Sequence, residues 1–452
     1  MNQNGMTTAL GNEKVGKLLM QYAIPAIIAM TASSLYNITD SIFIGHGVGA
    51  LAISGLAITF PLMNLAAAFG SLVGVGASTL MSLRLGQKDY KTANKILGNV
   101  FVLNLILGLA YTLVMLLFLD PILRFFGASA ATLPYAHQYM VVILLGNVVT
   151  HLFFGLNAML RSTGRPQKAM YATLCTVLIN VILNPLFIFV FKWGIQGSAF
   201  ATVISQTGML IWQIYIFSDK KQFIHLKKGT FKLERKIVLD SLSIGMSPFL
   251  MNAMSCIIVV IINQGLIRYG GDLAVGAYGI INRVIFLFVM IVMGFNMGMQ
   301  PIAGYNYGAG QYSRVTEVLK KTIFMATGVM TVGFLLGELF PRAVASIFTT
   351  DQTLINMAAE GLQIVVICFP IIGFQMVAGN FFQSIGMAHK AIFLSLTRQL
   401  IFLLPFLLIL PHFLGVKGIW YSMPSADFAA SLVSAFMLRA QFRTFKQKSV
   451  KI

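Results

Sequence analysis

Ser162-Thr163-Gly164-Arg165-Pro166-Gln167-Lys168-Ala169 has a counterpart in Ser384-Ile385-Gly386-Met387-Ala388-His389-Lys390-Ala391, 222 residues further along the chain. Ser, Gly, Lys and Ala stand at the same four positions of both stretches. The same offset joins further pairs, which are Leu51-Ala52 and Leu273-Ala274, Gly76 and Gly298, Gly86 and Gly308, Tyr90 and Tyr312, and Leu97 and Leu319. Because one offset holds over about 120 residues, the two halves are copies of one unit. Internal duplication of an apolar chain is typical of secondary transporters, whose two halves share a central binding site.

Composition indicates an integral membrane protein. Of the 452 residues, 57% are hydrophobic and only 10% are charged, whereas a soluble domain carries about 25% charged residues. The formal net charge of +19 does not indicate a nucleic-acid partner, because the basic residues lie in short loops between apolar stretches. The first apolar stretch, residues 18–44, is too long for a cleavable signal peptide, so we expect it to remain as the first span.

Apolar stretches long enough to cross a bilayer predict an all-α integral membrane fold with twelve transmembrane helices. They are expected at about residues 15–44, 55–83, 96–119, 134–160, 169–190, 198–217, 241–268, 276–305, 322–340, 356–382, 391–411 and 419–438. Six helices per half is an even number, so both copies enter the membrane from the same side as parallel repeats. We therefore predict an N-terminal six-helix bundle (1–217), a basic cytoplasmic linker (218–240), and a C-terminal six-helix bundle with a basic tail (241–452).

The positions of Lys and Arg predict the orientation in the membrane. One set of loops, together with the linker and the C-terminal tail, holds 25 of the 32 basic residues, and the opposite set holds five. The remaining two, Arg283 and Arg398, lie within predicted spans. Cytoplasmic loops carry the excess of Lys and Arg, so both termini and the linker are expected in the cytoplasm.

Asp40 is the main candidate for a functional residue inside the membrane. It lies deep in the first span, where a charge costs about 2.5–3.5 kcal/mol on insertion scales. Helical spacing places it on one polar stripe with Ser33, Tyr36 and Asn37. Neighbouring spans carry further polar residues at helical spacing, which are Thr173, Thr176, Asn180 and Asn184, then Ser198, Thr202 and Gln206, and Asn157.

The same polar groups could instead be interhelical hydrogen bonds that hold a bundle together. At the offset of 222, however, Asn180 and Asn184 map onto Phe402 and Phe406, so the second half lacks these groups. A polar cavity specialised in the first half explains this difference better than shared helix packing does. In the second half, Arg398 and Asp427 are expected to pair structurally.

Two kinds of chemistry are open to the Asp40 cluster. Burial disfavours the charged form of a carboxyl, so Asp40 could exchange a proton or be held ionised by a bound cation. Asn and Thr oxygens suit a hard cation, which gives a Na⁺ site at Asp40, Asn180 and Thr202 as the alternative. The six histidines are scattered, and no nucleotide-binding or hydrolase motif is present. We therefore expect no metal cluster, no cofactor and no enzyme activity.

Three sequence patterns make the chain similar to the MATE (multidrug and toxic compound extrusion) family, and within it to the DinF-like and MepA-like bacterial branch. They are Leu85-Gly86-Gln87-Lys88-Asp89-Tyr90, Leu160-Arg161-Ser162-Thr163-Gly164-Arg165-Pro166, and Asn180-Val181-Ile182-Leu183-Asn184-Pro185-Leu186-Phe187-Ile188-Phe189. The resemblance covers nearly the whole chain. It implies a V-shaped pair of six-helix bundles that export organic cations in exchange for H⁺ or Na⁺.

The resemblance also implies roles for individual residues. Asp40 matches the coupling carboxylate, and Asn157, Asn180 and Thr202 match polar positions around it. The family usually has Asp where Asn184 stands. Asp40 is thus the only acid of the cluster, which weakens Na⁺ binding.

We therefore expect a secondary active multidrug antiporter in the bacterial cytoplasmic membrane. It would export small organic cations in exchange for H⁺ or Na⁺ by alternating access, as a monomer in the lipid bilayer and without nucleic acid. The expected ion-coupling residues are Asp40, Asn157, Asn180, Asn184 and Thr202, and the expected substrate-cavity residues are Tyr36, Asn37 and Arg283. The alternative is a flippase or exporter of a lipid-linked saccharide or other anionic precursor. An ion channel or structural membrane subunit is a third class, which the presence of the Asp40 cluster in one half only disfavours.

Overall fold

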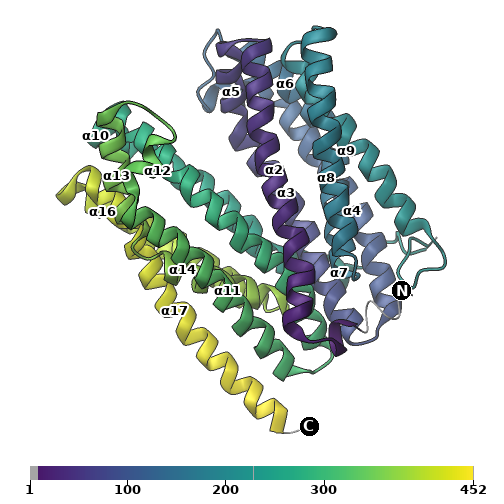
Figure 1. Ribbon diagram of the computed structural model, residues 1–452. Coiled ribbons are helices and arrows are strands. Elements are labelled where there is room, and N and C mark those ends of the chain that lie inside the picture. The colour runs from purple at the N-terminus through teal and green to yellow at the C-terminus, as the bar shows by residue number, and fades with distance from the viewer. Residues whose placement is uncertain (1–8, 228, 451–452) are drawn as a thin grey trace. The chain divides into compact units, whose positions relative to one another are not determined.

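Helices account for nearly all of the described chain (Figure 1). The computed structural model describes residues 9–227 and 229–450, and among these it leaves out the side chains of residues 37, 38, 50, 272 and 448–450. No strand occurs in these described ranges. The predicted all-α fold class is confirmed.

The chain divides into two compact units, and neither is one continuous segment. Unit 1 contains Ile28–Phe249 together with the N-terminal residues up to Asn12, and unit 2 contains Glu13–Ile27 and Leu250–Ile452. The first helix, α2 (Val15–Gly47), therefore belongs to unit 2 at its start and to unit 1 from Ile28 onward. Helix α10 (Arg235–Gly308) belongs to unit 1 at its start and to unit 2 from Leu250 onward.

Pro25 and Pro248 lie close to these two changes of unit, although α2 continues through Pro25 as one helix. The predicted domain boundaries at residues 217 and 241 divide the chain into its two sequence repeats. The compact units differ from these repeats, because each unit also includes the start of the first helix of the other repeat.

Unit 1 is built from the later part of α2, the start of α10 and the helices between them. In it α3 packs against α4 and α7, while α9 packs against α7 and α8. The remaining elements of unit 1 are α3 (Ala50–Gly86), α4 (Tyr90–Leu117), α5 (Leu119–Phe125), α6 (Leu133–Leu145), α7 (Asn147–Ser162), α8 (Pro166–Pro185), the π-helix η1 (Leu186–Val190) and α9 (Ile195–Ser218).

Unit 2 contains the rest of α10, which bends at Gly271, a glycine with a φ of 66°. Helix α14 packs against α11 and α17, and α16 packs against α17. The further elements of unit 2 are α11 (Tyr312–Leu339), α12 (Pro341–Ser346), α13 (Gln352–Val366), α14 (Phe369–Ser384), α15 (Ala388–Leu396), the π-helix η2 (Thr397–Leu403), α16 (Leu404–Leu414) and α17 (Val416–Val450).

The twelve predicted spans all fall on helices. Within the described residues, nine helices are long and apolar enough to cross a membrane. Two bent pairs of shorter helices bring the number to eleven if each pair is taken as one span. The twelfth predicted span, 419–438, lies in α17, which is less apolar because it carries Asp427 and several serines.

Two of the predicted spans each consist of two helices that meet at an angle. Helices α6 and α7 meet at an angle of 54°, and α13 and α14 meet at 55°. At the first break, a Cβ on Gly146 would lie 2.3 Å from the side chain of Val203, so only glycine allows α9 this close. At the second break, Pro370 opens α14 and cannot donate a hydrogen bond to the preceding helix.

Gly76 of α3 and Gly245 of α10 allow two helix backbones to touch inside unit 1. A Cβ on Gly76 would lie 1.9 Å from the carbonyl oxygen of Ser241, and a Cβ on Gly245 would lie 1.8 Å from that of Leu72. No side chain fits at these distances, so both helices need glycine at the crossing.

Gly298, which corresponds to Gly76 in the second repeat, lies at a similar close helix contact in unit 2. A Cβ on Gly298 would lie 2.7 Å from the backbone nitrogen of Ala23, at the start of α2. Each unit thus packs a repeated glycine against the start of the other repeat's first helix.

We predict that Gly76→Ala destabilises the folded protein, because the two backbones must move apart. Forcing additional atoms into a packed interior costs about 1–3 kcal/mol. The measurement is the melting temperature of the detergent-solubilised chain, followed by tryptophan fluorescence. The control is Gly208→Ala in α9, where no atom lies within 4 Å of the added Cβ. Equal melting temperatures for the two variants would contradict the close crossing.

Candidate functional site

Three helices of unit 1 each carry two polar side chains one turn apart. Residues at i and i+4 lie on the same face of a helix, so each pair points in one direction. The pairs are Tyr36 and Asp40 on α2, Asn180 and Asn184 on α8, and Ser198 and Thr202 on α9. All six join one hydrogen-bond network, which we call the Asp40 network.

At one end of the network, Asp40 holds α2 against the other two helices. Its Oδ1 atom accepts a hydrogen bond of 2.8 Å from the Ser198 hydroxyl and a second one from the Asn184 amide. The Asn184 amide also lies 3.4 Å from the Ser198 hydroxyl. Only 6% of Asp40 is exposed, so these two donors replace the water that a carboxylate otherwise binds.

At the other end, Thr202 is the shared partner of Tyr36 and Asn180. Its hydroxyl lies 2.8 Å from the Tyr36 hydroxyl and 3.2 Å from the carbonyl oxygen of Ser198. The Asn180 amide donates to the same hydroxyl oxygen at 3.1 Å. The Thr202 hydroxyl therefore makes three hydrogen bonds, which connect α2, α8 and α9.

Two oxygen atoms of the Asp40 network have no hydrogen-bond partner among the described residues. They are the buried Oδ1 of Asn184 and the Oδ2 of Asp40. Oδ1 of Asp40 thus accepts both hydrogen bonds of the carboxylate, and Oδ2 accepts none among the described residues.

The sequence analysis placed Ser198 on the α9 stripe but not among the ion-coupling residues. The structure makes it a direct hydrogen-bond donor to Asp40. The spacing of four residues to Thr202 was the available signal, because it puts both hydroxyls on one face of α9.

Asn157 does not join the Asp40 network, contrary to the expectation that it would. Its amide donates to the carbonyl oxygen of Ala169 at 2.9 Å and lies 3.4 Å from the Thr173 hydroxyl. Its Oδ1 accepts from the Arg161 guanidinium. Both polar atoms of the Asn157 side chain thus have partners outside the Asp40 network.

The three predicted cavity residues have different outcomes. Tyr36 belongs to the Asp40 network. The side chain of Asn37 lies outside the described part of the structure. Arg283 is in unit 2, is exposed, and has no carboxylate within 4 Å among the described residues.

The predicted pairing of Arg398 with Asp427 is confirmed. Arg398 Nε lies 2.5 Å from Asp427 Oδ1, and the Asp427 side chain is only 2% exposed. In addition, the Gln399 amide donates to the Ser255 hydroxyl at 2.9 Å. Unit 2 therefore buries its carboxylate together with a permanent counter-charge, whereas the Asp40 network contains neutral partners only.

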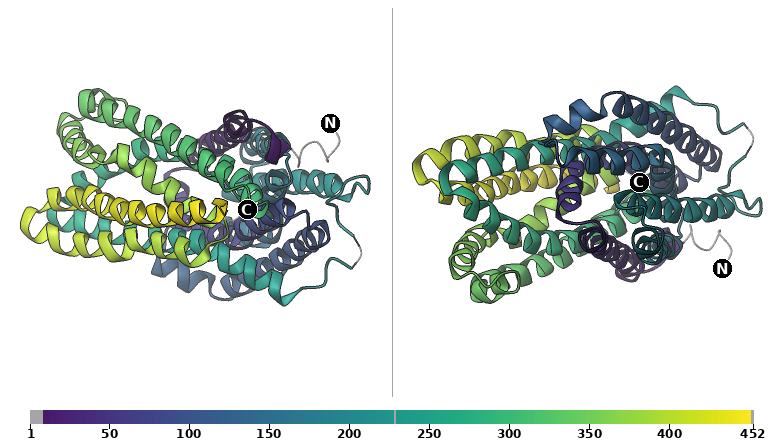
Figure 2. Two further views of the ribbon diagram at one scale, coloured as in Figure 1. Left: turned by 90° about the horizontal axis from the view of Figure 1, so that it is seen from below. Right: turned by 90° about the horizontal axis from the view of Figure 1, so that it is seen from above.

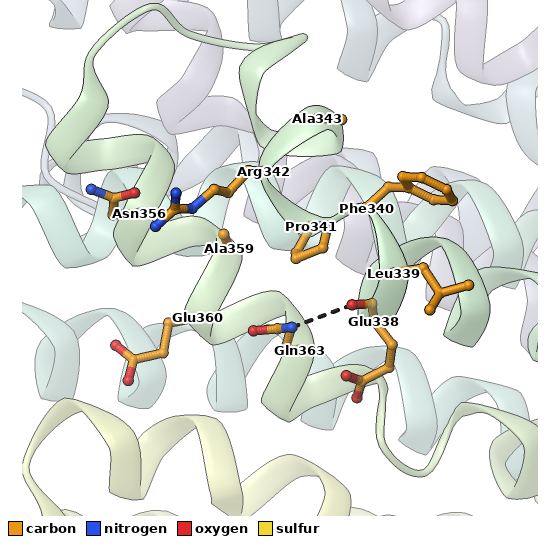
Figure 3. A pocket seen from close by; sticks show the side chains of 10 residues that line it. All are labelled: Glu338, Leu339, Phe340, Pro341, Arg342, Ala343, Asn356, Ala359, Glu360 and Gln363. Carbon is orange, nitrogen blue, oxygen red and sulfur yellow. Dashed lines mark hydrogen bonds between the residues drawn. The ribbon is translucent and has the colours of Figure 1, made fainter.

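Unit 2 also contains a cavity of about 520 Å³ between the end of α11, α12 and α13 (Figure 3). Glu338, Arg342 and Glu360 line it, and the Gln363 amide donates to the carbonyl oxygen of Glu338 at 3.3 Å. The Glu360 carboxylate lies 2.6 Å from Lys417. None of the lining residues belongs to the Asp40 network.

Comparison with known proteins decides the family. The sequence profile of the MatE family matches residues 25–186 and 244–409, which cover most of both repeats. The chain belongs to the MATE family. This confirms the resemblance seen in the sequence and identifies the chain as a multi-pass membrane transporter rather than a member of an enzyme family.

Relatives of this MATE protein match over nearly its whole length. The multidrug export protein MepA of Staphylococcus aureus (strain NCTC 8325 / PS 47) is 28% identical over 429 residues, which cover 94% of this chain and 93% of MepA. MepA of Staphylococcus haemolyticus (strain JCSC1435) is 26% identical over 422 residues, 93% of each chain.

Solved structures agree with the fold of this MATE protein. The MATE multidrug transporter DinF-BH, solved with a ligand bound, is 34% identical and has a TM-score of 0.90, covering 96% of this chain and 98% of its own. A MATE protein in a straight conformation is 25% identical with a TM-score of 0.92, covering 99% and 100%. These similarities support the twelve-helix fold.

We predict that Thr202→Val disrupts transport more than stability. The substitution keeps the shape of the side chain but removes the hydroxyl that joins Tyr36 and Asn180. A hydrogen bond between membrane helices contributes about 0.6 kcal/mol on average, so the melting temperature should fall only slightly while efflux falls strongly. The matched control is Thr207→Val on the same helix, whose hydroxyl bonds only to the carbonyl oxygen of Val203. Similar efflux by the two variants would count against the Asp40 network as a functional unit.

Proposed function

We propose that this MATE protein is a secondary active multidrug antiporter that exports small organic cations in exchange for protons. The observation that carries the proposal is the buried Asp40 carboxylate, which has one unpartnered oxygen and only neutral hydrogen-bond partners. The names of the relatives support the substrate class, since MepA is a multidrug export protein and DinF-BH is a multidrug transporter.

Protonation of Asp40 provides a physical coupling step. Hydrogen bonds to an ionised acceptor are roughly twice as strong as those to a neutral one. When Asp40 becomes neutral, its bonds to Ser198 and Asn184 weaken, so α2 is held less tightly to α8 and α9. A bound organic cation has the opposite effect, because it favours the ionised carboxylate. Proton and substrate therefore compete for the same negative charge, as exchange requires.

The membrane potential adds to this competition. Moving one charge across the membrane is worth about 2.3 kcal/mol per 100 mV. This energy exceeds that of a single interhelical hydrogen bond, so it is large enough to bias a rearrangement of the Asp40 network. Alternating access then releases the cation on one side and the proton on the other.

The proton is favoured over Na⁺ by the number of available oxygens. Hard cations bind several oxygen ligands at once. Of the expected Na⁺ ligands, Thr202 already makes three hydrogen bonds through its hydroxyl. Asn184 adds one free oxygen but no charge. A proton needs only Oδ2 of Asp40. Exchange with Na⁺ remains the alternative.

The location follows from the family and the charge pattern. We propose the bacterial cytoplasmic membrane, with both termini and the linker in the cytoplasm, since basic loops remain on that side. We also propose a monomer. An anionic substrate, as a flippase would move, is less favoured because the deep Arg398 is already paired with Asp427.

We predict that Asp40→Asn abolishes gradient-driven efflux. The assay measures release of ethidium from proteoliposomes under an imposed pH gradient and, separately, under a Na⁺ gradient. Wild type should respond to the pH gradient, and Asp40→Asn should fall to the level of empty liposomes, because an amide cannot take up the proton. Glu360→Gln serves as control, since this exposed carboxylate only pairs with Lys417.

Two results would overturn this assignment. Transport by Asp40→Asn equal to wild type would place the coupling group elsewhere. Absence of cation transport by wild type would favour the flippase alternative.

We further predict that Asn184→Asp makes efflux responsive to Na⁺. A second carboxylate next to Asp40 increases the local negative charge, which a metal cation can neutralise. The measurement is the rate of ethidium release at equal pH on both sides under a Na⁺ gradient. Asn157→Asp is the control, because Arg161 would neutralise that charge outside the Asp40 network. If wild type already responds to Na⁺ and not to pH, the proton assignment is wrong.

A further inference from the structure

The segment between α9 and α10 is attached along α4 of unit 1 rather than running free. The Asn94 amide donates to the carbonyl oxygen of Phe223 at 2.8 Å, and its Oδ1 accepts from the backbone nitrogen of His225 at 3.0 Å. We call this segment, residues 219–227 and 229–234, together with Arg235 and Lys236 at the start of α10, the linker strap. Figure 2 shows it as an irregular loop that follows the end of α9.

A second asparagine one and a half turns further along α4 repeats the arrangement. The Asn99 amide donates to the carbonyl oxygens of Thr230 and Lys232 at 3.3 and 3.1 Å, and its Oδ1 accepts from the backbone nitrogen of Glu234 at 2.8 Å. Between the two asparagines, Gly98 leaves room for the strap, because a Cβ there would lie 2.3 Å from the Thr230 carbonyl oxygen. The strap is thus held in one position.

Two aromatic side chains of the strap lie against α4 and still remain exposed. The Phe223 ring lies 5.7 Å from that of Tyr90, and the Phe231 ring lies 5.9 Å from that of Phe101. Phe223 is 48% exposed, and Phe231 and Leu233 are each 38% exposed. Phe101 belongs to the candidate membrane span Tyr90–Leu117, so Phe231 packs against a helix that is long and apolar enough to cross a membrane.

Six basic side chains of the strap form no salt bridge among the described residues. All of the following are exposed, and none lies within 4 Å of a carboxylate among the described residues: Lys220, Lys221, Lys227, Lys232, Arg235 and Lys236.

The two acids of the strap are occupied by other groups. Glu234 lies 2.6 Å from Lys95 of α4. Asp219 accepts from the Gln222 amide and from the backbone nitrogen of Lys221, both at 3.0 Å. These hydrogen bonds, that of Gln222 first, lower the pKa of Asp219.

We propose that the linker strap binds anionic phospholipids of the adjacent leaflet. Exposed aromatic and aliphatic side chains next to basic ones match the boundary between acyl chains and headgroups. Each Lys or Arg near an anionic membrane surface adds about 1 kcal/mol of attraction. A nucleic acid or a soluble acidic protein would also be attracted by the positive charge. Neither explains why exposed aromatic side chains lie next to that charge on a candidate membrane helix. The proposal does not depend on the coupling role of Asp40.

The test is native mass spectrometry of the full-length chain in detergent, with added phosphatidylglycerol or phosphatidylcholine. We expect wild type to retain phosphatidylglycerol in preference to phosphatidylcholine. The strap variant Lys220→Gln/Lys221→Gln/Lys227→Gln/Lys232→Gln should bind phosphatidylglycerol up to about a thousandfold more weakly, because four attractions of about 1 kcal/mol each are lost. The double variants Lys220→Gln/Lys221→Gln and Lys227→Gln/Lys232→Gln are measured separately as well, so that a folding defect in the fourfold variant does not decide the result.

A matched control removes four exposed basic residues from unit 2 with Lys320→Gln/Arg439→Gln/Arg443→Gln/Lys446→Gln. It should keep the lipid preference of wild type. An equal loss of phosphatidylglycerol in both fourfold variants would overturn the proposal, since binding would then depend on the total charge of the protein. No loss in either variant would also overturn it, since the strap lysines would then not contribute to binding. Displacement of the lipid by glycerol 3-phosphate would also overturn it, because the strap would then recognise a free phosphate and not a membrane.

Discussion

The hydrogen bonds that Asp40 Oδ1 accepts from Ser198 and Asn184 connect three helices of unit 1 at a single atom. A carboxylate inside a bilayer is expensive unless it is surrounded by donors. These two bonds therefore make it possible for α2 to carry a charge at this depth, and they orient the pairs on α8 and α9. The rest of the network, up to Tyr36 and Thr202, follows from that arrangement.

Sequence periodicity was sufficient to predict most of this network, because a turn of helix places residues i and i+4 on one face. Asp40, Asn180, Asn184 and Thr202 could be brought together in this way. Periodicity gives the direction of a side chain but not its partner. The contacts of Asn157 illustrate this, since its oxygen accepts from Arg161 on its own helix and its amide donates to Ala169. The break at Gly146 was missed because hydropathy measures how apolar a stretch is and not whether it is straight.

The two repeats share a backbone plan but have different electrostatics. The positions in unit 1 that correspond to Arg398 and Asp427 are Thr176 and Ser205, neither of which is charged. Conversely, unit 2 has phenylalanine where unit 1 has Asn180 and Asn184. Unit 2 therefore pairs a buried acid with a basic partner, whereas the Asp40 carboxylate of unit 1 has only neutral hydrogen-bond partners.

The exchange of helix starts between the two units affects how the chain can be assembled. Residues 13–27 are synthesised before the residues beyond position 250 with which they form a compact unit. The start of α2 therefore completes its unit only after much of the second repeat has been synthesised. For the same reason a cut in the linker would not separate the two units, because each fragment would retain the beginning of a helix that belongs to the other unit.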